Sequence, residues 1–232
     1  EVEFGRVKAY PPIEFALSDG TRCLLSGKID RLDGTFDEAG TRFFRVIDYK
    51  TGSAEFSYTD LYYGLKLQLP LYLAAVAAAD DAAHRALPAG FYYLPVKTPV
   101  LEEGLSGEAL LKEVQKAFRL RGVSLKNAEL LEAGGGPSVA PEKGTGVLDP
   151  EDFSAVAEFA RRKAAQTAEA VRTGRAETAP YRKSKRDTAC ARCDYASVCG
   201  FDPAFGGCTY RSVRTVKADA FLEEARHETV DE

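Results

Sequence analysis

The sequence has no Met, no Trp and only two His residues, His84 and His227. Neither histidine lies near a motif, so we expect both at the surface. The absence of Met reflects a bias toward Ala and Gly, or modified residues missing from the printed sequence. No apolar run is long enough to cross a bilayer, the longest candidate being Leu69–Ala79, and no secretory signal pattern opens the chain.

Excess positive charge and a nucleotide-binding loop are also missing. The net charge is −4 and the pI about 5.5, which is not the basic signature of an autonomous nucleic-acid binder. Any DNA contact must therefore come from local basic patches or partner subunits. The pattern G-x-x-x-x-G-K-[ST] is absent, so motor activity would lie elsewhere. The 232 residues suit one domain, and a start at Glu1 without Met indicates a fragment or a processed chain.

The stretch 27–52 is the feature around which the rest is organised. Two apolar runs, Cys23–Leu32 and Phe43–Lys50, are typical of strands. Between them, a loop containing Gly34, Asp37 and Gly40 predicts a hairpin. The first strand leads into Asp30, and the second carries Asp48 and Lys50.

Strand periodicity places these polar groups together. Asp48 and Lys50 share one face with Val46, whereas Ile47 and Tyr49 point to the other. An antiparallel partner strand could bring Asp30 within a few ångströms of Asp48. Two carboxylates beside an ammonium suit Mg²⁺, which prefers hard oxygen ligands. The simpler interpretation is that both aspartates cap turns, because D-x-K alone is a weak pattern.

A second polar pair follows in a segment, Leu61–Ala79, that we expect to be one buried helix packed on the sheet. Gln68 and Tyr72 are four residues apart and therefore share a helix face. The alternative is that Tyr72 belongs to the core and Gln68 faces solvent.

The remaining segments give a coarse outline. Residues 13–20 predict a strand and a turn into the Cys23 strand, so that three strands precede the helix. Further along, we expect a fourth strand at 88–97, one or two polar helices at 107–131, a loop at 133–137, a long helix at 149–173 ended by Gly174, and a charged tail after Arg214, frayed or helical. Arg161–Lys163 on the long helix is a solvated face or touches the DNA backbone.

Cysteines form the second chemical feature. Cys190, Cys193 and Cys199 have the spacing C-x₂-C-x₅-C, which is dense for core cysteines. Thiolates bind Zn²⁺ or iron–sulfur clusters, which usually take four ligands. The fourth ligand could be Cys208, Cys23 or a cysteine outside this chain; the alternative is free thiols or adventitious zinc. Nothing indicates secretion, so disulfides are not expected.

A basic run, residues 181–186, comes just before these cysteines. It could contact DNA phosphates, which would contribute affinity without sequence information. A solvated loop is an equally good interpretation.

Three motifs taken together carry a family resemblance: G-x-I-D-R at 27–31, I-D-Y-K-T-G at 47–52 and G-L-K-L-Q-x-x-x-Y at 64–72. In this order they resemble the RecB-like branch of the PD-(D/E)XK nuclease superfamily, and within it the nuclease domain of the AddB component of AddAB-type helicase–nucleases. The resemblance covers about residues 2–211. It implies an α/β fold with a central mixed β-sheet flanked by helices, a restriction-endonuclease-like core and a C-terminal cysteine-rich staple. The nuclease domain would span 1–211, and 212–232 would be a charged tail.

The resemblance also implies an activity. The chain would be a Mg²⁺-dependent DNA exonuclease domain, with Mn²⁺ as a substitute, in a helicase–nuclease for double-strand break repair and recombination. Asp30, Asp48 and the Tyr49 carbonyl would hold the metal, Lys50 would position or activate the attacking water, and Gln68 and Tyr72 would orient Lys50 or the scissile strand. Such nucleases commonly carry an upstream histidine near the metal, and no position here matches it.

Partners and the cluster follow from the same resemblance. An AddA-like subunit would deliver a single-stranded DNA end to this domain. The complex would act in the bacterial cytoplasm and would not associate with a membrane. In the AddB family three such cysteines join a distant upstream one around a [4Fe–4S] cluster; Cys190, Cys193 and Cys199 match them, and Cys208 departs from the pattern. The alternative function is a catalytically silent, iron–sulfur-stapled DNA-binding or assembly module.

Overall fold

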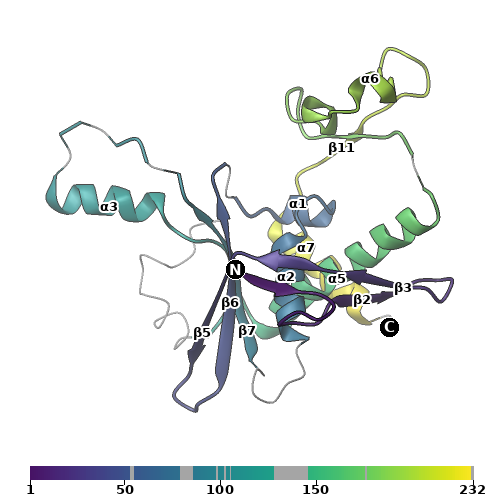
Figure 1. Cartoon of the computed structure of the whole chain (residues 1–232). Coiled ribbons are helices and arrows are strands. Elements are labelled where there is room, and N and C mark those ends of the chain that lie inside the picture. The colour runs from purple at the N-terminus through teal and green to yellow at the C-terminus, as the bar shows by residue number, and fades with distance from the viewer. Residues whose placement is uncertain are drawn as a thin grey trace.

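The structure is a computed structural model, and it describes residues 1–52, 55–78, 86–97, 99–101, 103–104, 106–127, 146–175 and 177–230 (Figure 1). His84 and the loop expected at 133–137 lie outside these ranges, whereas His227 is exposed, as expected. Among the described helices, none combines the length and the apolar character that crossing a membrane requires.

A five-stranded mixed sheet forms the centre of the fold. Its order is β5 (Arg31–Phe36), β6 (Arg42–Lys50), β7 (Leu87–Pro95), β8 (Arg121–Leu125) and β9 (Val147–Leu148). β5–β6 and β7–β8 are antiparallel, whereas β6–β7 and β8–β9 are parallel. This arrangement confirms the expected α/β class and the restriction-endonuclease-like core. The strands expected at 43–50 and 88–97 are also confirmed.

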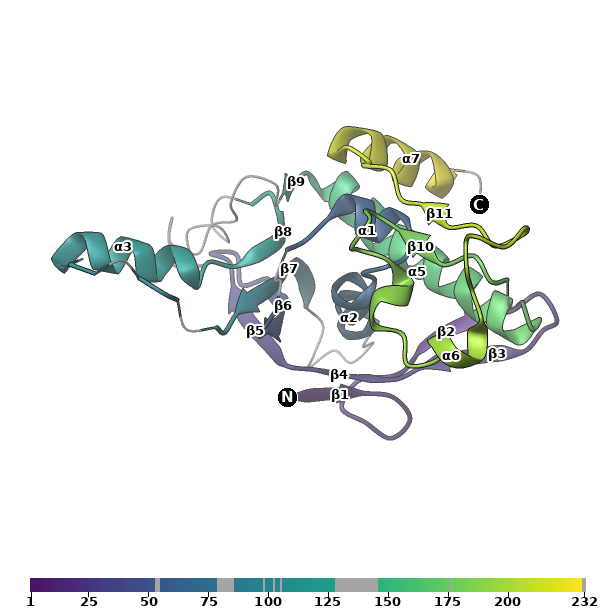
Figure 2. The same cartoon turned by 90° about the horizontal axis from the view of Figure 1, so that it is seen from above.

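Helices cover one face of the sheet. α2 (Gln68–Ala77) and α5 (Pro150–Arg172) lie on this face, and α7 (Ala218–Val230) packs outside α5 (Figure 2). Phe91, Phe159 and Phe221 are fully buried in the core between these layers. α5 begins at a proline after Asp149, as the sequence predicts, because the fixed φ of proline suits the first helical turn.

The single helix expected at 61–79 is wrong. The structure has a short α1 (Tyr58–Tyr62) and then α2, which begins at Gln68. The chain turns between them at Gly64, whose φ of 72° lies in the left-handed region that glycine adopts readily. The backbone N–H of Leu65 donates to the Asp60 carbonyl at 2.7 Å and closes this turn. The break places Gln68 at the first position of a new helix.

The continuous strand expected at 23–32 is also wrong. It is divided into β3 (Arg22–Leu25), β4 (Gly27–Ile29) and β5, because each part pairs with a different strand. β3 pairs with β2 (Ile13–Ala16), β4 with β1 (Val2–Phe4), and β5 with β6. Within the described residues, six strands therefore precede the first helix instead of three. Gly34 lies inside β5, and the hairpin turn runs from Asp37 to Thr41.

We expected one or two helices in the segment 107–131, and its described part holds one. α3 (Gly107–Ala117) has no buried residue and lies away from the rest of the domain (Figure 1). The chain then enters β8, where Gly122, Val123 and Ser124 are buried between neighbouring strands. The sequence did not indicate this strand, because it has only five residues and charged residues lie close to both of its ends.

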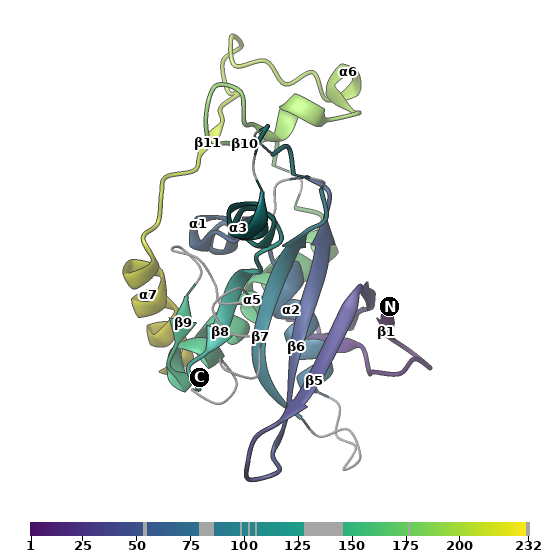
Figure 3. The same ribbon diagram turned by 90° about the vertical axis from the view of Figure 1, so that its left-hand side faces the viewer.

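The C-terminal part includes a segment that extends beyond α1 (Figure 3). It begins at β10 (Tyr181–Arg182), contains η2 (Ala189–Arg192) and α6 (Ala196–Cys199), and returns at β11 (Arg211–Ser212), which is parallel to β10. We call residues 183–210 the cysteine segment. The tail that follows is helical, one of the two expected forms, and its Phe221 is part of the core.

Candidate active site

Asp48 and Lys50 meet on one face of β6, as the strand alternation predicts. Lys50 Nζ lies 2.5 Å from Asp48 Oδ2. The Asp48 side chain is only 3% exposed, whereas Lys50 is 33% exposed. A buried carboxylate thus lies next to an ammonium group that reaches solvent.

Asp30 lies between the end of β4 and the start of β5, where the chain enters the central sheet. Its Oδ2 accepts a hydrogen bond of 2.9 Å from the backbone N–H of Tyr49. The Asp30 carboxylate therefore accepts, at the edge of β6, the kind of backbone hydrogen bond that a neighbouring strand would accept. Because the N–H and C=O of one residue point to the same side of an extended strand, the Tyr49 carbonyl faces Asp30 too. Asp30, Asp48 and Tyr49 thus lie at one corner of the sheet, where β4 and β6 end.

The electrostatics of Asp48 suit a bound cation. Burial raises the pKa of Asp48; Lys50 opposes this shift and the nearby Asp30 adds to it. Oδ2 contacts Lys50 as an ion pair but receives no well-directed hydrogen bond from the described residues. A divalent cation would supply the missing positive charge. Within the described ranges, no three His, Cys, Asp or Glu side chains gather into a metal site.

Gln68 and Tyr72 extend the same contact network. Lys50 Nζ donates to Gln68 Oε1 at 3.4 Å, and Gln68 Nε2 donates to the Tyr72 hydroxyl at 2.8 Å. Tyr72 packs edge-on against Phe4, with 5.8 Å between ring centroids. The expected shared helix face is therefore present. Gln68 is exposed, and Tyr72 is half-buried against the core, so both alternative interpretations also hold in part.

The chain is similar in sequence to proteins of a known family. Residues 1–200 match the family model described as the PD-(D/E)XK nuclease superfamily. The chain belongs to this superfamily. It is also similar to proteins named as the B subunit of an ATP-dependent helicase/deoxyribonuclease. The one from Alkaliphilus metalliredigens is 31% identical over 99% of this chain and 21% of that protein. The one from Caldanaerobacter subterraneus subsp. tengcongensis is 34% identical over 93% of this chain and 20% of that protein.

This nuclease domain spans about a fifth of the length of those relatives. Nucleases of the superfamily generally use divalent metal ions, and Asp30 and Asp48 carry carboxylate oxygens of the kind that such ions bind. The matched residues 1–200 include Cys190, Cys193 and Cys199 and end before Cys208.

Sequence reasoning missed one residue of the candidate site, Tyr93 on β7. It pairs with Asp48 across the parallel β6–β7 ladder, and its ring lies 5.4 Å from Lys50 Nζ. A cation near an aromatic face is attracted to the ring quadrupole, so Tyr93 helps to hold Lys50. Burial, followed by the charges of Asp48 and Asp60, raises the pKa of Tyr93 to about 12. The phenol therefore stays protonated. Its only signal in the sequence was its place in the apolar run at 88–97.

Two further groups of candidate residues are the cysteines and the basic run of α5. All five cysteines are free thiols, and Cys193 and Cys199 are exposed. In the part of the chain that the structure describes, three thiols do not come together into a metal site.

On α5, Lys163 lies 5.2 Å from the Phe159 ring, and Arg162 donates to the Ala225 carbonyl. These two side chains therefore pack against aromatic and C-terminal residues, whereas the exposed Arg161 pairs with Glu158.

Proposed function

We propose that this domain is a Mg²⁺-dependent deoxyribonuclease of the exonuclease type that hydrolyses phosphodiester bonds. The observation that carries the proposal is the contact of Lys50 with the buried Asp48 carboxylate, with Asp30 beside them. Family membership supports the class of reaction. The alternative, a catalytically silent DNA-binding or assembly module, gives no reason to keep an ammonium against a buried carboxylate.

Each side chain of the site has a role in this reaction. Asp30, Asp48 and the Tyr49 carbonyl would hold the Mg²⁺ ion, which would neutralise charge on the phosphoryl group and make the attacking water more acidic. Lys50 would position that water and stabilise the negative charge that develops on the phosphate. Gln68 and Tyr72 would fix the direction of Lys50 through their hydrogen-bonded chain.

The wider setting comes from the relatives. They are named as subunits of an ATP-dependent helicase/deoxyribonuclease. We therefore propose that this domain acts beside an AddA-like helicase–nuclease subunit in the bacterial cytoplasm. It would cut the single-stranded end that the helicase releases, during double-strand break repair and recombination.

A [4Fe–4S] cluster is a separate part of the proposal. It rests on the spacing of Cys190, Cys193 and Cys199 and on the family resemblance, with a fourth ligand outside this chain; Cys208 is the less favoured choice. Among the described residues, the arrangement of the thiols does not by itself form a cluster site. A cluster would hold the cysteine segment in place, and no step of the hydrolysis depends on it.

Substituting Lys50 tests the proposed activity. The Lys50→Ala variant should cleave linear single-stranded DNA about 100- to 1000-fold more slowly than the wild type in Mg²⁺ or Mn²⁺, because a positioned charge at the reacting phosphate is lost. Lys112→Ala on the exposed α3 removes the same charge away from the site and should leave the rate unchanged. Equal cleavage by the Lys50→Ala variant and the wild type would refute the proposed site.

A further inference from the structure

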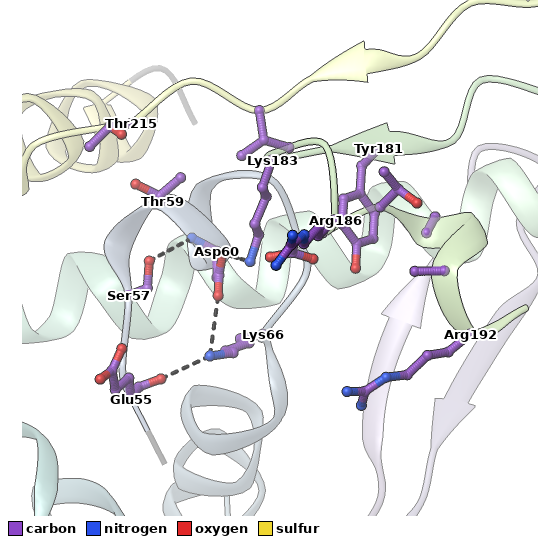
Figure 4. Close-up of a pocket in the computed structure, with 15 residues that line it drawn as sticks. Glu55, Ser57, Thr59, Asp60, Lys66, Tyr181, Lys183, Arg186, Arg192 and Thr215 are labelled. Carbon is purple, nitrogen blue, oxygen red and sulfur yellow. Dashed lines mark hydrogen bonds and ion pairs between the residues drawn. The ribbon is translucent and has the colours of Figure 1, made fainter. Parts of the chain in front are cut away.

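A polar pocket lies between α1 and the start of the cysteine segment. Its volume is about 900 Å³, and its walls include Asp60 and Lys66 on one side and Lys183, Arg186 and Arg192 on the other (Figure 4). We call it the Asp60 pocket. The pocket has no role in the hydrolysis described above. Its lining holds four cationic side chains and three carboxylates, a net charge of +1 in a chain whose net charge is −4.

Asp60 forms the base of the pocket and fixes its two lysines. The carboxylate is 6% exposed and lies 3.2 Å from Lys66 Nζ and 2.5 Å from Lys183 Nζ. One negative charge thus holds two positive ones, and a net positive charge remains. Lys183 also joins the cysteine segment to α1, so this wall of the pocket is fixed to the body of the domain.

The arginines supply the charge that is free to bind. Arg186 and Arg192 are exposed, and neither guanidinium forms an ion pair with any residue that the structure describes. Two further carboxylates, Glu55 and Asp187, belong to the lining. Glu55 is 74% exposed and lies 3.9 Å from Arg121. The pocket therefore presents two guanidinium groups together with a lysine pair, which suits contacts with phosphates of a nucleic-acid backbone.

The pocket adjoins the active site. Lys66 in its wall is two residues before Gln68, which contacts Lys50. Asp60 at the pocket and Asp48 on β6 both lie near enough to Tyr93 to raise the pKa of its phenol. A strand that passes through the pocket could continue to the reacting phosphate.

We propose that the Asp60 pocket binds the phosphodiester backbone of single-stranded DNA next to the scissile phosphate, through Arg186, Arg192 and the lysine pair on Asp60. This inference rests on the proposed function, because the bound strand is the nuclease substrate. The contacts go to phosphates, so binding is independent of base sequence.

Binding without divalent metal tests the proposal. The probe is a fluorescein-labelled oligodeoxythymidine, followed by fluorescence anisotropy over a salt series in EDTA. The Arg186→Ala/Arg192→Ala variant should bind about tenfold more weakly at low salt, and its slope of log K against log salt should fall by about 1.4, since each single-strand phosphate contact contributes about 0.7. With an abasic strand as the probe, the arginine variant should show the same loss of affinity relative to the wild type.

The control is Lys112→Ala/Lys116→Ala, which removes two charges from the exposed α3 and should leave affinity and slope unchanged. Equal binding by the arginine variant and the wild type, an abasic strand that does not bind, or a wild type that does not bind would each overturn the inference. Cleavage separates it from the proposed function: the arginine variant should show a raised KM and an unchanged kcat. If the wild type cleaves DNA and the arginine variant binds and cleaves equally well, the pocket proposal alone is refuted. If the arginine variant loses binding but neither it nor the wild type cleaves DNA, the nuclease proposal alone is refuted.

Discussion

Replacing Asp48 by Asn should reduce Mg²⁺-dependent DNA cleavage by about a thousandfold and leave the fold at least as stable as before. The first effect arises because the amide carries no charge to hold a divalent ion or to pair with Lys50. The second arises because burial raises the pKa of Asp48, so keeping it ionised costs folding free energy. Lys50 is one-third exposed and can be solvated when its partner is neutral.

The pH dependence of this stability difference has a defined sign. A raised pKa in the folded state means that stability is fully present below the ordinary carboxyl value of 3.8 and is lost as the pH rises through the raised pKa. Without metal, Asp48→Asn should therefore unfold at an equal or higher temperature than the wild type at neutral pH, and the difference should narrow as the pH falls toward 4. Thermal unfolding across this pH range measures it.

Asp219→Asn is a suitable control, because Asp219 is an exposed residue in the first turn of α7. It should leave cleavage unchanged and should not raise the unfolding temperature, because a carboxylate in the first turn of a helix is itself slightly stabilising. A loss of stability in Asp48→Asn at neutral pH would mean that the carboxylate stabilises the metal-free fold. Retained cleavage would mean that Asp48 does not hold the metal.

Gly122→Ala should destabilise the domain by about 3 kcal/mol. Gly122 lies on β8 opposite Tyr92, and an added Cβ would lie 1.9 Å from the Phe91 carbonyl oxygen and 2.8 Å from the Tyr92 Cα. These are backbone atoms of the central strand β7, so no side-chain rotation can make room. The change should separate β8 from β7 beside the fully buried Phe91 and Val123. Urea unfolding measures the loss.

Gly34→Ala is the matched strand control. An added Cβ at Gly34 on β5 would meet its nearest atom, the Phe43 carbonyl oxygen, at an ordinary distance of 3.7 Å. Its free energy of unfolding should change by less than about 0.5 kcal/mol. If Gly122→Ala unfolds at the same urea concentration as the wild type, β7 and β8 do not pair in the register seen here.

The sequence predicted the parts of the site that depend on local periodicity. Alternation along 43–50 was enough to place Asp48 and Lys50 on one face, because the side chains of a strand alternate with a period of two. The four-residue spacing likewise placed Gln68 and Tyr72 on one helix face. The proline after Asp149 and Gly174 marked the ends of α5 for equally local reasons.

Features that depend on partners far along the chain were not predicted. The run at 23–32 looks continuous, and only its three different pairing partners divide it. Tyr93 joins the site through the parallel register of β6 and β7, which no local pattern encodes. The turn at Gly64 was not predicted, because the apolar residues before and after it in Leu61–Ala79 have the pattern of one continuous helix. Asp60 carried no motif, and its role depends on Lys183, far along the chain.

Binding of Mn²⁺, followed by electron paramagnetic resonance of the free ion, tests the central claim most directly. That claim is that Asp30 and Asp48 together form the divalent-ion site of this nuclease domain. The wild type and Lys50→Ala should both remove Mn²⁺ from the free signal, because Lys50 is not a ligand. Asp30→Asn/Asp48→Asn should not remove it. Equal Mn²⁺ binding by the double aspartate variant and the wild type would contradict the claim.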